Sequence, residues 1–391
     1  MITGDATYIK KINRSLIISK IIEHGMVSRA DLSKITGLNK ATISVQVSDL
    51  LAEELIIETR QEHKNLGRRP IMLSINKHAG FVLGVDLDSH TITFTLSDIS
   101  GFPIQTDIIE LHTSDYDEIL KLLIREINYY KNESAQTRYG LVGVIIGIHG
   151  IVNKDEMIDF VPKHHWQNKH LKEDLETAVG ISVCIENNAN LCSFAEIVYK
   201  HHQSNNLLSV NLYSGIGLGI MVNGELLKGY HGYAGEIGHI IVVPDGKPCN
   251  CGNCGCWEQY ASEYSFFKQL AQKKETLWVS YEDIRGWLIH QEPVTLVQIH
   301  EFIKFLSIGL NNLINLYNPE ILIINSELLC LYPNAIDQIK AQLASTVSHY
   351  RELLLSELGK DACIMGACAL AIKNFLDISE LKLTIYTDPL Q

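Results

Sequence analysis

The segment 235–258 constrains this chain more than any other, because it gathers one histidine and four cysteines into a short stretch. Imidazole and thiolate groups at such close spacing form the tetrahedral Cys₃His set that closes a structural zinc site. The sequence therefore predicts a zinc ion held by His239, Cys249, Cys251 and Cys256. Cys254 either replaces one of these ligands or stays spare.

Two carboxylates, Glu236 and Glu258, flank the predicted ligands in the same segment. A Cys₃His site needs neither of them, so both can accept hydrogen bonds from a bound molecule. A neutral histidine that binds a metal through one ring nitrogen keeps the other for a further hydrogen bond. We therefore expect His239 to serve the metal and a ligand at once, with the metal preorganising the ligand site.

The length of 391 residues predicts two or three domains. No apolar run of about 18 residues predicts a membrane span, and the N-terminus lacks the pattern of a secretory signal. In a chain without such a signal, the crowding of cysteines into 249–256 favours metal over disulfides. We expect a cytoplasmic protein without membrane contacts.

Charge is unevenly distributed along the chain. Residues 1–76 carry 11 Lys and Arg against 8 Asp and Glu, whereas the remainder carries 22 against 37. A mildly basic module on an acidic body fits nucleic-acid contact at one end only, although chance variation over a short window gives the same pattern.

Residues 1–76 have the pattern of a winged helix-turn-helix. An apolar stripe predicts a helix over 11–23, and a capping pattern at 28–31 opens a second helix that ends at Gly37. Asn39 can cap a third helix over about 40–53, and strands at 56–59 and 71–75 would form the wing. Two short helices separated by a glycine-containing turn place the second of them in the DNA major groove.

DNA contacts are expected on three surfaces of this module. The exposed side of the third helix would face bases, with Gln46 a weaker candidate beside the buried stripe. The start of the second helix suits a phosphate, and an arginine pair in the wing suits a minor groove unless it is only a solvated basic turn. The candidates are Ser28, Arg29, Lys40, Thr42, Ser44, Val45, Arg68 and Arg69.

Residues 80–391 predict an α/β body. Strands within 81–111, a helix at 119–130 and an apolar strand at 141–148 recur in a similar order from Leu207 onward. This weak echo predicts two similar lobes, and crevices between such lobes commonly bind small ligands. The isolated cysteines are expected in the core, namely Cys184, Cys192, Cys330, Cys363 and Cys368.

Polar residues follow two predicted strands of the body. His149 ends the strand 141–148, and Asn187 and Asn188 follow the strand 181–185. The asparagines either line a cleft, where their amides and the two glutamates suit a polyhydroxylated ligand, or only cap the next helix. The glycine run 214–219 either cradles phosphate or permits tight bends before a hairpin turn at Asn223-Gly224, and the second interpretation is favoured.

Five stretches of the chain, 28–51, 66–86, 185–196, 232–239 and 247–263, resemble the ROK family of repressors, open reading frames and sugar kinases. Within that family the chain is most similar to the xylose repressors of Gram-positive bacteria. The resemblance implies a winged helix-turn-helix on a two-lobed ribonuclease-H-like (actin-like, sugar kinase-like) body, assembled as a homodimer or a dimer of dimers. It also implies a sugar site on Asn187, Asn188, Glu236, His239 and Glu258.

The chain departs from the kinases of this family in two places. They carry Asp as general base where this chain has Asn188, and an amide has no basic lone pair to take a proton. Their first phosphate loop resembles Asp-x-Gly-Gly-Thr, whereas 86–90 has no glycine pair and carries an extra carboxylate. The family often has Pro where His149 stands, and Asn188 also departs from the Glu of many xylose repressors.

Together these patterns predict a repressor of a carbohydrate operon, first of all xylose, and no enzyme. It would bind an inverted-repeat operator, lie on the nucleoid when bound, and be released by a neutral sugar such as D-xylose, since no Lys or Arg cluster in the motifs would hold a sugar phosphate. Two alternatives stay open: a sugar kinase with a fused DNA-binding domain, and a metal-sensing repressor, against which the closed Cys₃His set argues.

Overall fold

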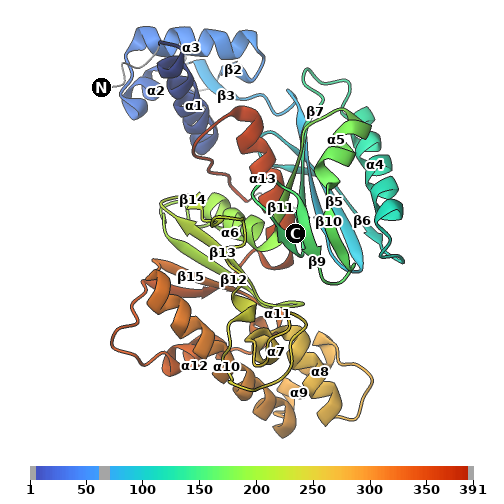
Figure 1. Cartoon of the computed structure of the whole chain (residues 1–391). Helices are drawn as coiled ribbons and strands as arrows, with labels where there is room; N and C mark the ends of the chain where they lie inside the picture. Colours follow the sequence, from blue (N-terminus) through green and yellow to red (C-terminus); the bar gives the residue numbers. More distant parts are fainter. Residues whose placement is uncertain (1–5, 61–70, 386–391) are drawn as a thin grey trace. The chain divides into compact units, whose positions relative to one another are not determined.

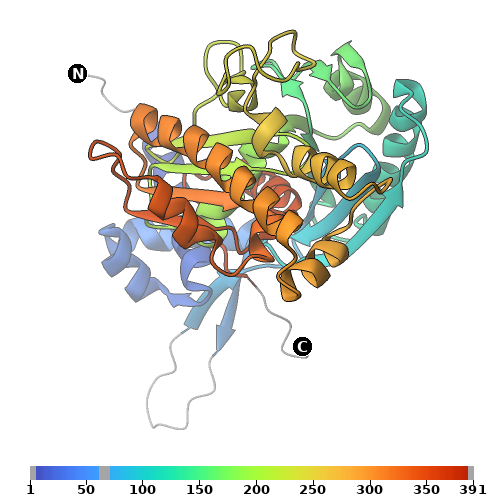
Figure 2. The ribbon, with the colours of Figure 1, turned by 90° about the horizontal axis from the view of Figure 1, so that it is seen from below.

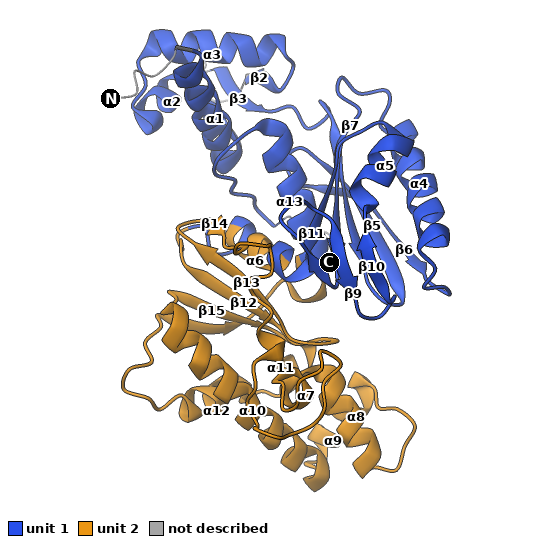
Figure 3. Cartoon of the chain, in the orientation of Figure 1, with its two compact units in different colours: residues 1–191, 198–202, 363–391 blue, residues 192–197, 203–362 orange. Residues whose placement is uncertain are grey.

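The computed structural model describes residues 6–60 and 71–385 (Figure 1). The chain divides into two compact units, drawn in different colours in Figure 3. Unit 1 comprises residues 1–191, 198–202 and 363–391, and unit 2 comprises 192–197 and 203–362. No helix in the described ranges is long and apolar enough to cross a membrane.

The N-terminal part of unit 1 contains three helices and a three-stranded antiparallel sheet of order β1-β3-β2. Ser28 caps the second helix by accepting a hydrogen bond from the Asp31 N–H, and Gly37 ends it in the left-handed conformation. Asn39 caps the third helix through the Thr42 N–H, as the sequence predicts. The elements are α1 (Ala6–His24), β1 (Val27–Ser28), α2 (Arg29–Thr36), α3 (Lys40–Ala52), β2 (Ile56–Arg60) and β3 (Ile71–Ile75).

The C-terminal segment of the chain packs against α1. Ser19 Oγ donates to the Glu380 carbonyl at 2.7 Å, and the Ser379 N–H donates to Ser15 Oγ at 3.1 Å. Ile378 and Leu381 are buried in the same segment. The helix α1 and residues 378–381 are thus packed together within unit 1.

The main sheet of unit 1 has the order β11-β7-β4-β5-β6, in which β11, β7 and β4 are parallel and β4, β5 and β6 antiparallel. Apolar residues of α4 and α5 join those of the strands in one core. Gly84 and Gly147 let α13 approach the sheet, because a Cβ at either position would meet a cysteine Sγ of that helix within 2.7 Å. The elements are β4 (Phe81–Leu87), β5 (Thr91–Asp98), β6 (Pro103–Glu110), α4 (Tyr116–Glu133), β7 (Leu141–Ile148), α5 (Leu171–Val179), β11 (Val183–Asn187) and α13 (Ala362–Leu376). A small separate sheet contains β8 (Ile151–Val152), β9 (Ile158–Val161) and β10 (Trp166–Lys169).

The sheet of unit 2 repeats this topology with the order β14-β13-β12-β15-β16, antiparallel over β12, β13 and β14 and parallel over β12, β15 and β16. The predicted echo between two α/β halves is therefore confirmed at the level of strand order. The helices α10 (Pro293–Tyr317) and α12 (Ala335–Gln342) lie over one face of this sheet (Figure 2). The strands are β12 (Leu207–Asn211), β13 (Gly217–Val222), β14 (Glu225–Leu226), β15 (Ile321–Asn325) and β16 (Glu352–Leu355).

Helices fill the rest of unit 2. They are η1 (Ile237–His239), α7 (Glu258–Ala261), α8 (Glu263–Lys273), α9 (Tyr281–Ile289), α10 (Pro293–Tyr317), α11 (Glu327–Cys330), α12 (Ala335–Gln342) and η2 (Gly359–Asp361). The helix α6 (Asn188–Tyr199) contributes residues to both units.

Glu292 accepts hydrogen bonds from the N–H groups of Val294 and Thr295 and so caps the long helix α10 at Pro293. The expectation for the isolated cysteines differs in part from the structure. Of the five cysteines expected in the core, three are buried, Cys184 is half-buried and Cys330 at the end of α11 is exposed. The expectation for Cys330 is wrong, since a solitary thiol carries no sequence signal for its side of a short helix.

Candidate functional site

The cysteine-rich loop between β14 and α7 folds closely onto β13. Gly235 has φ of +100°, and a Cβ at this position would lie 2.2 Å from the Leu218 carbonyl oxygen of β13. Within the loop, isolated bridges pair Ile241 with Cys256 and Pro248 with Cys254. This local folding brings residues ten to seventeen positions apart in the sequence into contact with η1.

The four predicted metal ligands converge in this loop. Each of them offers one ligand atom, and these atoms all lie within 4.8 Å of one another. Cys249 Sγ lies 3.6 Å from His239 Nδ1, and Cys251 Sγ lies 3.6 Å from Cys256 Sγ. A tetrahedral zinc ion with Zn–S bonds of about 2.3 Å needs sulfur atoms about 3.8 Å apart, so the spacing fits the donor set. Cys254 is exposed and is not a member of the group.

The two glutamates of the segment lie beside this cluster. Glu258 Oε1 accepts from Cys249 Sγ at 3.1 Å and lies 3.8 Å from His239 Nδ1. Its Oε2 lies where a Cβ on Gly215 would be only 3.1 Å away, so the glycine makes room for this carboxylate. Burial raises the pKa of Glu236, the His239 charge opposes that shift, and Glu258 adds to it. A half-buried pair of carboxylates therefore lies beside the four predicted metal ligands.

The glycine run beside this pair has a structural role in the described chain. Gly217 and Gly219 lie in β13, and Asn223-Gly224 turns the chain into β14 with both residues at positive φ. The predicted hairpin turn is thus present, whereas these two glycines of the run lie within a strand and not in a tight bend.

The two asparagines of the predicted sugar site belong to unit 1, at the end of β11 and the start of α6. Asn187 Oδ1 accepts from the Ala189 N–H at 2.8 Å, and Asn187 Nδ2 donates to the Gly150 carbonyl at 2.8 Å. Its side chain thus performs the capping role that the sequence left open. Asn188 is half-buried, and its Nδ2 lies 3.3 Å from His149 Nδ1.

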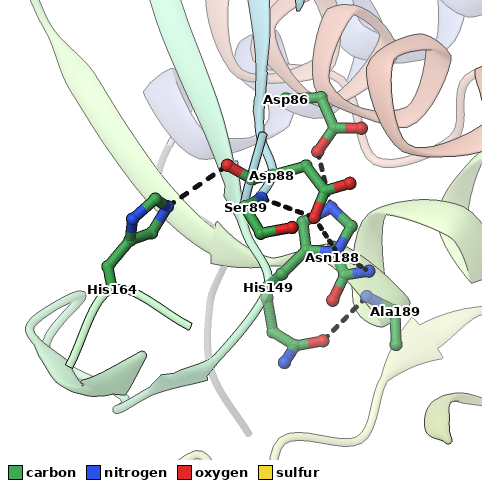
Figure 4. A network of polar contacts seen from close by, with 8 residues as sticks. Asp86, Asp88, Ser89, His149, His164, Asn188 and Ala189 are labelled. Atoms are coloured by element: carbon green, nitrogen blue, oxygen red, sulfur yellow. Dashed lines mark hydrogen bonds and ion pairs between the residues drawn. The ribbon is translucent and has the colours of Figure 1, made fainter. Parts of the chain in front are cut away.

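A polar network surrounds Asn188 in unit 1 (Figure 4). His149 Nε2 lies 2.9 Å from Asp86 Oδ1, and His149 Nδ1 lies 3.7 Å from Asp88 Oδ1. Burial lowers the pKa of His149, but the charge of Asp86, its hydrogen bond and the charge of Asp88 outweigh burial and raise the pKa to about 9. His149 is therefore an imidazolium at neutral pH.

Sequence reasoning noted His149 but missed its two carboxylate partners and Cys363. One oxygen of Asp86, one ring nitrogen of His149 and the Cys363 Sγ lie within 4.8 Å of one another. Asp86 lies near the end of β4 and His149 directly follows β7, and these two parallel strands are neighbours whose carboxyl ends meet at one edge of the sheet. The expected pairing of the two strands could therefore have predicted the contact between Asp86 and His149. Cys363 lies on α13, more than 200 residues after His149 in the sequence, and no local pattern predicts that the two side chains are close.

The predicted sugar-site residues are thus distributed over the two units. Asn187 and Asn188 lie in unit 1, whereas Glu236, His239 and Glu258 lie in unit 2. Within unit 2, the structure brings His239 and Glu258 together with the cysteine cluster.

The predicted DNA contacts differ in their exposure. Lys40, Ser44 and Val45 are exposed on α3, Thr42 is half-buried, and Gln46 is buried as its place beside the apolar stripe indicates. Ser28 is buried with its hydroxyl committed to the α2 cap. The guanidinium of Arg29 pairs with Glu58 at 2.6 Å. Arg68 and Arg69 lie outside the described residues.

Comparison with known proteins defines the class. The model of the ROK family matches residues 82–374, so the chain belongs to the ROK family. It is 37% identical over 388 residues to a protein of Bacillus spizizenii named xylose repressor, covering 97% of this chain and 99% of the relative.

Two solved structures extend this likeness. A ROK family transcriptional regulator, described as a homologue of the E. coli MLC protein, superposes with a TM-score of 0.80 at 29% identity and covers 94% of this chain and 97% of that one. A ROK glucokinase from Streptomyces griseus, solved with glucose and AMPPNP, superposes with a TM-score of 0.66 at 25% identity, over 74% of this chain and 99% of its own. The chain therefore has a mixed α/β body of the sugar-kinase kind. The regulator matches nearly the whole chain, whereas the glucokinase matches about three quarters of it.

Proposed function

We propose that this chain is a transcriptional repressor of a xylose-utilisation operon, released from its operator by a neutral sugar. The observation that carries the proposal is the share of this chain that each kind of relative matches. Proteins named as repressors or regulators match 94–97% of this chain, whereas the glucokinase structure matches 74%. The quarter of the chain that the glucokinase leaves unmatched is of the size of the N-terminal helical module, which a sugar kinase does not need.

The N-terminal module supports DNA binding as a winged helix-turn-helix covering residues 1–76. Its third helix, α3, leaves Lys40, Ser44 and Val45 exposed while the apolar stripe is buried. A helix with these side chains fits a major groove, where Lys binds phosphate or guanine and a Val methyl contacts thymine. A homodimer or dimer of dimers would present two such helices to an inverted repeat, acting in the cytoplasm and on the nucleoid.

The body, residues 80–391, supports sugar binding with two ribonuclease-H-like (actin-like) lobes. Asn188 in unit 1 and Glu236, His239 and Glu258 in unit 2 offer planar amide, carboxylate and imidazole groups, which suit the hydroxyls of a neutral sugar. We propose D-xylose because the relatives at 35–37% identity are named xylose repressors.

We propose zinc for the Cys₃His cluster, in a structural role. His239 would bind the metal through Nδ1, the ring nitrogen that faces Cys249. Bound zinc would supply a rigid cross-link, and Nε2 of the ring would stay available for a hydrogen bond to the sugar. The carboxylate of Glu258 lies next to that ring.

A sugar kinase is the second candidate, because the body is similar to a glucokinase. The residues argue against turnover. Asn188 cannot act as a general base, and the extra carboxylate of Asp88 disfavours a phosphate nearby.

Operator binding in the presence of sugars tests the proposal. Fluorescence anisotropy with an operator duplex is expected to show that D-xylose weakens binding, while L-arabinose and glucose 6-phosphate have no effect. A Glu258→Gln variant is expected to keep operator binding and lose the response to xylose. Sugar-independent operator binding would refute the repressor proposal, and xylose-dependent ATP turnover in a coupled assay would favour the kinase.

A further inference from the structure

Cys254 lies near the exposed tip of the cysteine-rich loop. An antiparallel bridge pairs it with Pro248, and the Cys249 N–H donates to the Asn253 carbonyl at 2.8 Å, so the chain forms a short hairpin here. Every residue from 250 to 254 is exposed. The Cys254 side chain is therefore accessible to small molecules in solvent, although the hairpin fixes its backbone.

Cys251 is the exposed member of the four predicted metal ligands. Cys249 and Cys256 are buried and His239 is half-buried, whereas Cys251 lies in the same exposed tip as Cys254. The Cys251 Sγ is 3.6 Å from Cys256 Sγ, which keeps it in the donor set. The thiol outside that set is Cys254, so it is the one that a bound metal would leave free to react.

The two exposed cysteines have the spacing of a redox pair. Two residues separate Cys251 from Cys254, and this Cys-x-x-Cys spacing is typical of dithiols that form and break a disulfide. Such a bond needs Cα atoms within about 7 Å of each other. Gly252, between the two cysteines, has φ of +96°, and a Cβ on it would meet no atom within 4 Å. The turn that joins them therefore has room to tighten.

We propose that Cys251 and Cys254 form a disulfide in the presence of a peroxide, and that this bond removes Cys251 from the metal site and releases the zinc ion. This inference rests on the proposed function, in which a Cys₃His zinc site supports the sugar site. It assigns Cys254 the role of a peroxide-reactive thiol and Cys251 that of the resolving thiol, which is the usual arrangement of redox-sensing cysteines.

The reaction has two steps. The Cys254 Sγ attacks one oxygen of the peroxide, the O–O bond breaks, and the other oxygen leaves as water with the thiol proton, so that Cys254 becomes a sulfenic acid. The Cys251 thiolate then attacks the Cys254 sulfur, the S–S bond forms, and the hydroxide that leaves takes a proton from solvent. The two sulfur atoms lose two electrons, which the peroxide gains. Zinc retains His239, Cys249 and Cys256, and this incomplete set no longer closes a structural site.

Loss of the ion would act on the proposed sugar ligands of unit 2. Glu258 Oε1 accepts from Cys249 Sγ at 3.1 Å and lies 3.8 Å from His239 Nδ1, so the cluster positions both this carboxylate and the imidazole. Without zinc, His239 has no fixed orientation to offer to a sugar. Oxidation is therefore expected to weaken xylose binding and to leave the repressor on its operator when the sugar is present.

The test treats the full-length, zinc-loaded protein with hydrogen peroxide in the presence of a chromogenic zinc chelator. The wild type is expected to lose its zinc and to gain a disulfide that peptide mass spectrometry assigns to Cys251 and Cys254, and dithiothreitol with added zinc is expected to reverse both changes. Cys254→Ser keeps all four ligands, so it should hold its zinc under peroxide and respond to xylose normally. Cys330→Ser removes an exposed thiol elsewhere in unit 2 and, as the matched control, should lose zinc like the wild type.

Three results would overturn the inference. They are zinc retention by the peroxide-treated wild type, zinc release from Cys254→Ser at the wild-type rate, and a disulfide that joins Cys251 to Cys249 or Cys256 instead of Cys254. Absence of zinc from the reduced wild type would overturn the inference together with the proposed metal, whereas release of the operator by xylose would still support the repressor. Peroxide-driven zinc release through Cys254 in a protein that never responds to xylose would support the disulfide and refute the proposed function.

Discussion

Replacing His149 by glutamine is expected to remove a stabilisation that depends on pH. The pKa of His149 is raised from its ordinary value of 6.5 to about 9, chiefly by Asp86 and Asp88 against the opposing effect of burial. A group whose pKa is higher in the folded than in the unfolded state stabilises the fold fully below the unfolded pKa. That contribution is lost as pH rises through the folded pKa.

Linkage gives the magnitude. With these two pKa values, protonation of His149 stabilises the fold by about 3 kcal/mol at pH 6, about 2 kcal/mol at pH 7.5 and about 0.4 kcal/mol at pH 9. Glutamine can donate to Asp86 but cannot titrate. The difference in unfolding free energy between the wild type and His149→Gln should therefore shrink by roughly 2–3 kcal/mol from pH 6 to pH 9.

Urea unfolding of both proteins at pH 6, 7.5 and 9 measures this difference. The comparison cancels the titration of the other histidines and the cysteines, which both proteins share. His112→Gln is the matched control, because His112 is exposed in the loop between β6 and α4. Its effect is expected to stay within about 0.5 kcal/mol at every pH. Parallel curves of unfolding free energy against pH for the wild type and His149→Gln would refute the reasoning, because the pKa of His149 would then be the same in the folded and unfolded states.

Three further perturbations test other parts of the account. Lys40→Ala removes an exposed cation from α3, so the slope of log affinity for DNA against log salt should become less negative by about 1, and an unchanged slope would exclude a phosphate contact. Cys256→Ser should lower the zinc content of the purified protein, measured by atomic emission, together with its melting temperature, and full zinc retention would remove Cys256 from the ligand set. Gly309→Ala should destabilise by about 1–3 kcal/mol in calorimetric unfolding, because the new Cβ would lie 2.0 Å from Trp257, whereas Gly286→Ala in α9 meets no atom within 4 Å and should stabilise by up to about 1 kcal/mol; equal effects would contradict the packing argument.

The sequence predicted those features that depend on local patterns. Capping residues determined the ends of α2 and α3, since Ser28, Gly37 and Asn39 act on neighbours within three positions. The spacing of His239 and the cysteines predicted the cluster, because all four ligands lie in one loop.

The remaining features depend on contacts between distant segments. The interaction of the C-terminal segment with α1 joins residues more than 350 positions apart, and no periodicity records it. The network of His149 has the same origin, since Asp86 and Asn188 reach the ring only through the pairing of β4 with β7 and of β7 with β11. The cap that Asn187 forms on α6 is local, whereas its second hydrogen bond, to the Gly150 carbonyl, depends on a segment that the sequence does not place beside it.

The central claim is that this protein binds a sugar and an operator, and that the binding of each lowers the affinity for the other. The most direct measurement is the affinity for D-xylose with and without saturating operator DNA, paired with the operator affinity with and without saturating xylose. The account predicts that each ligand weakens the other by the same factor, because coupling between two sites is reciprocal. Equal xylose affinity in the presence and absence of operator would contradict it.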